Sequence, residues 1–542
     1  MALFDRASLV QIPSGYKEGK LYNIKPFDQP FEFERGSSAT RVNEDGLIER
    51  FYNEATNLLL QSNQFDTTWT PSVIDAPTNG FEGYDGSSNA WSLVPTSTNT
   101  SCRLAQSIST SGLNTFSVYA KANGGNGLTL RHQDSTTGAR FDLSNGTLGI
   151  KASSVIKHSI EDVGNGWYRC SVVLNQSITE MRIYVSDVAN SYSCTEGNGI
   201  YIQDAQLESG YFATPYIETT TEAVTRPNRH DTPRIDYTNG KSLLLEPQRT
   251  NLITYSNDFQ EWSEQTANIL STNNLSPSGE YNATEVQFQA EGKRIRMNVS
   301  TSVESYLSIY VKGVSGETVQ LANGNGSQVY TLSGDWDRLV LQAISGVNNF
   351  TIRKQGTTAE VVQIYGAQLE QGSYATSYIP TNGQTETRLE DVCEGGGDES
   401  TFNASEGTLY CELSALGDDI TNRYIGLSDG TDDNRIILGF KNASNTVRVF
   451  SQTGAVTQVQ IDATYNITNV NKIALTYKSN DVKLWVNGSE AGSKTTYTTV
   501  SEFTTLNFDS GSGNSKLKAN VKALAYFPEE LTDTELQELT TI

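Results

Sequence analysis

The sequence lacks any long apolar run. None of its 542 residues belongs to a stretch approaching 18 consecutive apolar residues, and Met1-Ala-Leu-Phe-Asp-Arg6 lacks the basic and then apolar pattern of a secretion signal. We therefore expect a protein that is made in the cytoplasm and does not insert into a membrane. If it acts outside a cell, we expect it to leave by another route, such as on a particle.

Histidine is scarce, and the usual catalytic motifs are missing. The three histidines, His132, His158 and His230, lie in no zinc or nucleophile motif, and no Gly-x-Ser-x-Gly sequence stands at a strand-to-helix junction. Carboxylates are so numerous that the sequence singles out no pair as a glycosidase dyad. The sequence therefore indicates a binding or structural protein rather than an enzyme, and we assign no catalytic residue.

Basic residues and cysteines are also few. Lys and Arg number 39 against 62 Asp and Glu, so the formal net charge is −23. Because phosphates need cationic partners, we expect neither nucleic acid nor anionic lipid as a ligand. The five cysteines are spaced too irregularly for a disulfide framework or a zinc site. We expect buried free thiols, with a Cys102–Cys194 or a Cys393–Cys411 bridge as the alternatives.

Aromatic and turn-forming residues are abundant instead. The 26 Tyr, 19 Phe and 6 Trp exclude a disordered chain, and 45 Gly with many Asn, Ser and Thr favour turn-rich β structure. A chain of this length is expected to form several domains. The one convincing helix lies near the end, where Thr532 and Glu535 form a capping box ahead of Leu536 and Leu539.

The chain contains an internal duplication. Residues 56–217 and 250–379 both open on Thr-Asn-Leu and Ser-Asn-x-Phe, and both close on Ala-Gln-Leu-Glu and Ala-Thr-x-Tyr-Ile. Each copy follows a lead-in whose two alternating segments and Gly turn are typical of a β-hairpin. The second copy is about thirty residues shorter, and we expect the extra loops of the first at 77–101 and 183–198.

The clearest strand in each copy carries our candidate ligand-binding residues. In Ser117–Lys121 and Ser308–Lys312, alternation places Val, Ala or Ile on one face and Ser, Tyr and Lys on the other. Because Lys is rarely buried, we assign ligand binding to this second face, with a merely solvated face as the alternative. Its aromatic and basic residues are Tyr119, Lys121, Tyr310 and Lys312. We interpret the tryptophans of the copies as core residues.

The region after the Gly-rich linker at 395–400 forms a further unit. Segments 472–477 and 482–486 alternate and predict a hairpin with one buried side. Trp485 alternates away from that side, so we expect an exposed or interface aromatic there. The turn at 428–434 is rich in the oxygen ligands that Ca²⁺ prefers, with a plain hairpin tip as the favoured alternative. Its candidate metal ligands are Asp429, Asp432 and Asp433. We expect no other cofactor.

These patterns predict an all-β protein built of tandem β-sandwich (jelly-roll) domains followed by a laminin-G/concanavalin-like sandwich. Short strands separated by turns, without helical periodicity between them, are typical of this class. We divide the chain into an N-terminal arm at 1–50, a first jelly roll at 51–225, a second with its hairpin lead-in at 226–395, and the terminal sandwich at 396–542.

Residues 36–391 resemble the carbohydrate-binding-module-like jelly rolls of bacteriophage tail and minor structural proteins. The resemblance rests on the Thr-Asn-Leu opening, the Ser-x-Tyr-x-Lys strand, the Gly, Trp and Arg block around Trp167 and Trp336, and the Ala-Gln-Leu-Glu close. The C-terminal unit resembles a laminin-G/concanavalin-like sandwich through its 473–477 strand, its 482–488 hairpin and its capped terminal helix.

The resemblance implies a virion protein that projects from a phage particle as a tail or capsid fibre or decoration and adheres to host glycans. Its N-terminal arm would bind other virion proteins, and host cell-surface polysaccharide would be its ligand. It would be made in the host cytoplasm and act in the virion. Avidity in a homo-oligomer, for which a trimer is one candidate, would multiply weak contacts. Two alternatives stay open: a purely structural spacer or decoration without glycan binding, and a polysaccharide-degrading tail protein.

Overall fold

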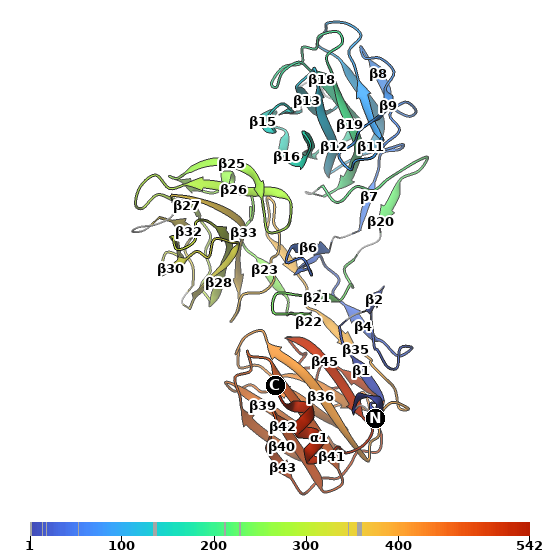
Figure 1. Cartoon of the computed structure of the whole chain (residues 1–542), viewed down its shortest axis with the longest axis vertical. Coiled ribbons are helices and arrows are strands. Elements are labelled where there is room, and N and C mark those ends of the chain that lie inside the picture. Colours follow the sequence, from blue (N-terminus) through green and yellow to red (C-terminus); the bar gives the residue numbers. More distant parts are fainter. Residues whose placement is uncertain are drawn as a thin grey trace.

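The computed structural model describes residues 3–13, 15–17, 19–51, 54–133, 138–210, 213–226, 229–344, 346–354 and 360–542. It confirms the all-β class, with three sandwiches joined by small sheets (Figure 1). The helices among these residues are η1 (Leu3–Arg6), η2 (Phe259–Glu261) and α1 (Asp533–Thr540). In this described part, no helix has the length and apolar character needed to cross a bilayer.

The first repeat is a sandwich of two six-stranded sheets at one end of the molecule (Figure 1). Its strands are β7 (Ala55–Asn57), β8 (Thr70–Ser72), β9 (Thr78–Phe81), β10 (Ala90–Leu93), β11 (Arg103–Thr110), β12 (Leu113–Asn123), β13 (Gly127–His132), β14 (Ala139–Asp142), β15 (Thr147–Lys151), β16 (Val155–Gly164), β17 (Trp167–Asn175), β18 (Ile178–Ser186), β19 (Gly199–Ser209) and β20 (Val224–Arg226). The β12 sheet has the order β16-β17-β12-β19-β10-β9, and the β13 sheet has the order β15-β14-β13-β18-β11-β8. Alternate apolar residues such as Val118 and Leu130 fill the space between them.

The second repeat has the same plan with five strands in each sheet. Its strands are β23 (Arg249–Asn251), β24 (Glu264–Gln265), β25 (Asn268–Leu275), β26 (Tyr281–Gln287), β27 (Arg294–Met297), β28 (Ser305–Lys312), β29 (Thr318–Ala322), β30 (Ser327–Thr331), β31 (Asp337–Ala343), β32 (Phe350–Arg353), β33 (Val361–Gln371) and β34 (Glu386–Arg388). The β28 sheet has the order β25-β26-β33-β28-β31, and the β29 sheet has the order β24-β27-β32-β29-β30. Even the register shift before Tyr119 in β12 recurs before Tyr310 in β28.

The extra residues of the first repeat lie only partly where we expected: within 183–198, the β18–β19 connection is longer than its counterpart between β32 and β33. Segment 77–101 carries β9 and β10, whose counterparts in the second repeat are β25 and β26. The main insertion is instead the pair β15 and β16 between β14 and β17, a place where β30 runs almost directly into β31. Its sequence alternates too weakly to be recognised as strand, because β16 is half-buried along most of its length.

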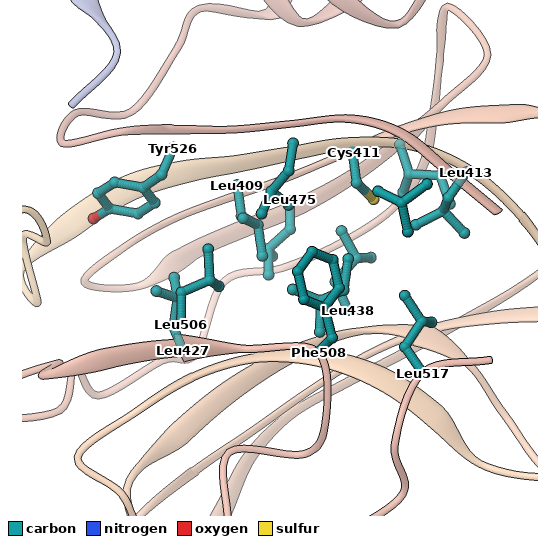
Figure 2. Packing of buried hydrophobic residues seen from close by; sticks show 14 of the residues in the cluster. Leu409, Cys411, Leu413, Leu427, Leu438, Leu475, Leu506, Phe508, Leu517 and Tyr526 are labelled. Atoms are coloured by element: carbon teal, nitrogen blue, oxygen red, sulfur yellow. The ribbon is translucent and has the colours of Figure 1, made fainter. Parts of the chain in front are cut away.

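The C-terminal sandwich closes its core between an eight-stranded and a five-stranded sheet. Its strands are β36 (Glu406–Ala415), β37 (Arg423–Ser428), β38 (Arg435–Phe440), β39 (Thr446–Thr453), β40 (Val456–Thr464), β41 (Asn471–Lys478), β42 (Asp481–Val486), β43 (Ser489–Lys494), β44 (Thr505–Asn507) and β45 (Ala519–Phe527), completed by β1 (Leu9–Gln11), β21 (Arg234–Asp236) and β22 (Ser242–Leu245). Figure 2 shows Leu409, Leu475 and Tyr526 of one sheet facing Leu427 and Leu438 of the other. The predicted hairpin of β41 and β42 and the capping box of α1 are confirmed.

The N-terminal segment, which we expected to be an extended arm, instead packs in part against this sandwich. Strand β1 pairs with β45, opposite Leu524–Tyr526, and the N-terminus lies beside the C-terminal sandwich in Figure 1. The remaining N-terminal strands are β2 (Gly15–Lys17), β3 (Lys20–Tyr22), β4 (Phe31–Glu34), β5 (Ala39–Val42) and β6 (Ile48–Phe51), and β4 pairs with β35 (Val392–Glu394). The physical reason is burial, since Leu9, Phe31 and Phe33 belong to the same core. Both lead-ins form the predicted hairpins, β5–β6 and β21–β22.

A buried ion cluster ties the second repeat to its surroundings. Arg234 donates to Glu246 over 2.6 Å and also pairs with Asp391, while Arg388 lies 2.9 Å from Glu246 and Arg35 lies 3.2 Å from Asp391. These five side chains are almost completely buried. Burial of the Glu246 carboxyl disfavours its ionised form. The positive charges of Arg388 and Arg234 outweigh this effect and lower the pKa of Glu246 to about 2. Segments far apart in sequence are therefore joined at one point.

One disulfide forms among the described residues. Cys102, just ahead of β11, bonds to Cys194 in the loop between β18 and β19. Cys170, Cys393 and Cys411 are buried free thiols, as we expected for the cysteines in general. Of the two bridges considered from the sequence, only the first is therefore made.

Candidate functional site

In the first repeat, the predicted ligand residues lie on the outer face of the β12 sheet. Tyr119 points away from the core as alternation predicts, but it is only 8% exposed. Its ring stacks on Tyr84 with centroids 3.8 Å apart, and the Arg169 guanidinium lies 5.3 Å from its centroid. Lys121 is half-buried at the edge of this cluster. A sugar therefore finds no open platform on Tyr119.

In the second repeat, the equivalent face is covered by another part of the chain. Tyr310 is half-buried beside Tyr365 and Tyr378, and Ile48 of the β5–β6 hairpin packs against the same cluster. The Arg338 guanidinium lies 5.5 Å from the Tyr310 centroid, in the manner of Arg169 and Tyr119. Lys312 is half-buried. Sequence alternation therefore identified the correct face in both repeats but not the segments that cover it.

Trp485 does not have the exposure that we expected. It alternates away from the main core, as predicted, but it is only 8% exposed. Helix α1 covers it, and Leu536 and Leu539 join it in a small apolar cluster on the outer side of the sheet. The expectation of an exposed aromatic was wrong because the helix that ends the chain packs on this very face.

The three candidate calcium ligands are not gathered around one point. Asp429 accepts hydrogen bonds from Thr431 Oγ1 at 2.6 Å and Asn434 Nδ2 at 2.9 Å, so it stabilises its own turn. Asp432 pairs with Arg435, and Asp433 is exposed. Nowhere in the described ranges do three or more His, Cys, Asp or Glu residues form a group that could hold a metal ion. The geometry is that of a plain hairpin tip.

A cleft of about 680 Å³ lies between the two repeats and the β5–β6 hairpin. Its size is in the range of small-ligand sites, and interfaces between domains are a common place for them. Its polar and aromatic lining includes Arg50, Lys157, His158, Ser159, Glu161, Arg169, Asn257, Asp258, Thr272, Glu280, Tyr281, Asn282, Tyr365 and Asn382.

Contacts from the inserted strand β16 build this cleft. Lys157 Nζ donates to Asn382 Oδ1 over 3.3 Å and lies 3.8 Å from Asp258 Oδ2, both in the second repeat. On the hairpin side, the Ile48 amide donates to the Pro277 carbonyl over 2.9 Å. The walls of the cleft are therefore joined directly, even though their residues come from three distant segments.

Two carboxylates give the cleft its electrostatic character. Partial burial raises the pKa of Glu161 to about 7, the nearby charge of Glu280 adds to the rise, and Arg169 opposes it. Partial burial likewise raises the pKa of Glu280, again opposed by Arg169. The raised pKa values favour the protonated form of these carboxyls, which can donate as well as accept hydrogen bonds, beside a guanidinium.

The cleft can bind a polyhydroxylated molecule. Carboxyl, amide, hydroxyl and guanidinium groups supply the hydrogen bonds, and Tyr281, which is 40% exposed, offers an open ring for the C–H face of a sugar. The sequence analysis missed these residues, because strands β6, β16 and β26 are far apart in the chain. The one available signal was that β16 falls in residues that the second copy lacks.

Residues 399–537 match the family described as the Concanavalin A-like lectin/glucanases superfamily, which agrees with the fold of the C-terminal sandwich. Among solved structures, the CBM40 domain of the Ruminococcus gnavus IT-sialidase bound to alpha2,3 sialyllactose is similar at 16% identity, covering 27% of this chain and 93% of that one (TM-score 0.24). Domain 4 of AbnA, a GH43 extracellular arabinanase from Geobacillus stearothermophilus, in complex with arabinotriose, is similar at 12% identity, covering 32% and 84% (TM-score 0.23). Mouse laminin alpha1 domains LG4-5 are similar at 10% identity, covering 50% and 96% (TM-score 0.18). The comparison with curated proteins gives no match.

Proposed function

We propose that this protein binds glycans in the cleft between its two repeats and acts as an adhesion protein on a virus particle. The observation that carries the glycan part is the cleft itself, about 680 Å³ lined by hydrogen-bonding groups and the open ring of Tyr281. The lectin-type superfamily matched by residues 399–537 supports a carbohydrate ligand for the chain as a whole. No metal or catalytic group is needed for this activity.

The virion part of the proposal rests on the resemblance of residues 36–391 to phage tail and minor structural proteins. Contact with other virion proteins falls to the N-terminal segment, where Ile24 and Phe27 are 56% and 66% exposed. Such exposed apolar side chains suit a protein interface. Assembly as a homo-oligomer, with a trimer as the candidate, would multiply weak glycan contacts.

Binding of full-length protein to host-surface polysaccharide tests the glycan part. We expect Tyr281→Ala to weaken binding about tenfold, because a stacking ring is lost. Tyr306→Ala, which removes a half-buried tyrosine outside the cleft lining, serves as the matched control. Full affinity in Tyr281→Ala, or no binding by the unaltered protein, would refute the cleft as the site.

Two further measurements separate the alternatives. Release of reducing ends from the polysaccharide by the unaltered protein, abolished in Glu161→Gln, would favour a polysaccharide-degrading protein. Mass spectrometry of purified phage particles tests the virion part. Presence in particles without any glycan binding would favour a purely structural decoration, and absence from particles would overturn the virion assignment.

A further inference from the structure

A second hollow lies on the outer face of the β29 sheet in the second repeat. It measures about 330 Å³ and has arginines from two neighbouring strands on its floor, Arg296 of β27 and Arg353 of β32. Between them stands Thr351, directly opposite Arg296 in the register of the two strands. The remaining polar lining comes from Ser327 and Asn349. We call this hollow the arginine groove.

The charge of the arginine groove is positive, although the chain as a whole carries −23. Arg294 and Arg296 share one carboxylate, Glu264, at 2.7 and 3.1 Å. Arg353 Nε donates to the neutral side-chain amide oxygen of Gln320 over 2.5 Å. The two arginines that line the groove are therefore matched by the single carboxylate of Glu264, which Arg294 also contacts, so the groove carries excess positive charge.

The opposite wall of the groove is backbone. Gly324 has φ +85°, and a Cβ there would lie 2.6 Å from Asn349 Nδ2, so only glycine permits this close approach. The Asn323 side chain fixes the loop by accepting hydrogen bonds from the amides of Asn325 and Gly326 at 2.8 and 2.5 Å. The groove is thus a preformed polar slot rather than a gap between mobile side chains.

The same face of the first repeat also carries arginines, but other side chains of that repeat cover them. On the β13 sheet these are Arg103, Arg131, Arg140 and Arg182. Here, however, tyrosines fill the face: Tyr184 lies 4.8 Å from the Arg131 guanidinium, and Tyr192 lies 4.3 Å from that of Arg140. The loop that carries Tyr192 is held by the Cys102–Cys194 disulfide. The second repeat, which has no cysteine between residues 250 and 379, keeps its face open.

We propose that the arginine groove binds the carboxylate of acidic sugar residues, of the uronic-acid type, in a polysaccharide. A guanidinium group donates charge-assisted hydrogen bonds to a carboxylate. Arg296 Nε already donates to Thr351 and its Nη1 lies 3.1 Å from Glu264, and Arg353 Nε donates to Gln320, so the remaining N–H groups of the two arginines would bind the sugar carboxylate. Thr351, Ser327 and Asn349 then supply partners for the sugar hydroxyls. This inference rests on the proposed glycan binding and names the class of glycan.

Calorimetric titration of the full-length protein with oligogalacturonate and with its fully methyl-esterified form tests this. The ester keeps the sugar chain and removes the negative charge. We expect the acid to bind at least about tenfold more tightly than the ester, and high salt to weaken the acid alone. Equal affinity for the two forms would overturn the proposal.

Variants place the effect in the groove. We expect Arg296→Gln/Arg353→Gln to weaken acid binding about tenfold or more and to leave ester binding unchanged. Arg296→Lys/Arg353→Lys should have an affinity between those of the unaltered protein and the glutamine variant, because the positive charge remains but the two-pronged guanidinium donor is lost. Arg448→Gln on β39, which removes one arginine of the C-terminal sandwich, is the control and should bind normally. An equal loss in this control, or none in the double glutamine variant with an intact circular dichroism spectrum, would refute the groove.

The outcome also separates this inference from the proposed function. If oligogalacturonate binding depends on Tyr281 but not on Arg296 and Arg353, the cleft is supported as the glycan site and the arginine groove is refuted. If only neutral glycans bind, glycan binding again stands and the acidic class falls. Failure of the protein to bind any glycan would remove both.

Discussion

The two repeats share a hydrogen-bond framework that explains nearly all of their shared sequence. Asn57 Nδ2 donates to the Ile217 carbonyl over 2.8 Å, and Asn251 Nδ2 donates to that of Ile379 over the same distance. Further along, an Arg donates to the carbonyl of the closing Thr over 2.5 Å in each copy, from Arg169 to Thr214 and from Arg338 to Thr376. The repeated motif therefore closes the sandwich in each copy.

The repeats differ in how much contact they make with the rest of the chain. Arg226, in the last strand of the first repeat, is half-buried and donates to the Pro215 carbonyl over 3.2 Å. Its counterpart Arg388 is fully buried and pairs with Glu246 in the central ion cluster. The first repeat is thus peripheral, and the second is built into the centre of the molecule. Duplicated residues maintain the fold, whereas the cleft also depends on the inserted strand β16 and the β5–β6 hairpin, which the two copies do not share.

The substitution Asp391→Asn tests this contrast between the repeats and has the largest expected effect on stability. The substitution removes the carboxylate that pairs with buried Arg35 and leaves Arg234 with Glu246 alone, and we expect a loss of about 4 kcal/mol in the free energy of unfolding. Hydrogen–deuterium exchange should quicken in the second repeat and the C-terminal sandwich, with the first repeat unchanged. Asp258→Asn removes only a surface ion pair to Lys157 and should cost less than about 1 kcal/mol. Faster exchange confined to the first repeat would contradict the central role of the cluster.

The reverse test is removal of the disulfide by Cys102→Ser/Cys194→Ser. Because the bond closes a loop across most of the first repeat, its loss should cost that repeat about 3 kcal/mol. Exchange should quicken throughout the first repeat and stay constant in the second, which has no cysteine. Cys170→Ala, which alters a buried free thiol of the same repeat, is the control for simple loss of packing. Equal exchange before and after would show that the bridge does not stabilise the repeat.

Alternation within strands predicted local structure well. It identified the outward faces of Tyr119, Tyr310 and Trp485, the hairpin of β41 and β42, and the capped helix α1. These features depend on neighbours within a few residues, where periodicity and capping act. The all-β class follows from the same local signals.

Exposure and the candidate site were not predictable in this way, because both depend on distant segments. Trp485 is covered by α1, and the face of Tyr310 is covered by the hairpin that carries Ile48. Strand β1 has only three residues, too few for any periodicity, and it forms only because β45 offers a free edge. The cleft likewise brings together Arg50, Glu161 and Glu280 from three separate strands or turns.

The smallest and most local difference is one residue at a shared bend. Asp204 and Gly366 occupy the same place with φ of +54° and +64°, but only the first brings a carboxylate into the sandwich face. Burial, together with the charges of Asp85 and Glu218, raises the pKa of Asp204 to about 7, although Tyr84 donates to it over 2.9 Å.

The folded pKa of Asp204 therefore lies above its value of 3.8 in the unfolded chain. The contribution of Asp204 to the free energy of unfolding is fully favourable below about pH 4 and is lost as the pH rises through about 7. The first repeat should therefore become less stable over that window. Asn tolerates the left-handed backbone and cannot ionise, so Asp204→Asn should stabilise the first repeat by about 2 kcal/mol at pH 8 and leave it nearly unchanged at pH 4. Exchange of each repeat, measured between pH 4 and 8 with correction for the intrinsic rate, gives the comparison directly, and the second repeat serves as the control because Gly366 has no carboxylate. A first-repeat profile that is the same in Asp204→Asn as in the unaltered protein would place the pH dependence elsewhere, with Glu161 as the next residue to test because its pKa is also raised to about 7.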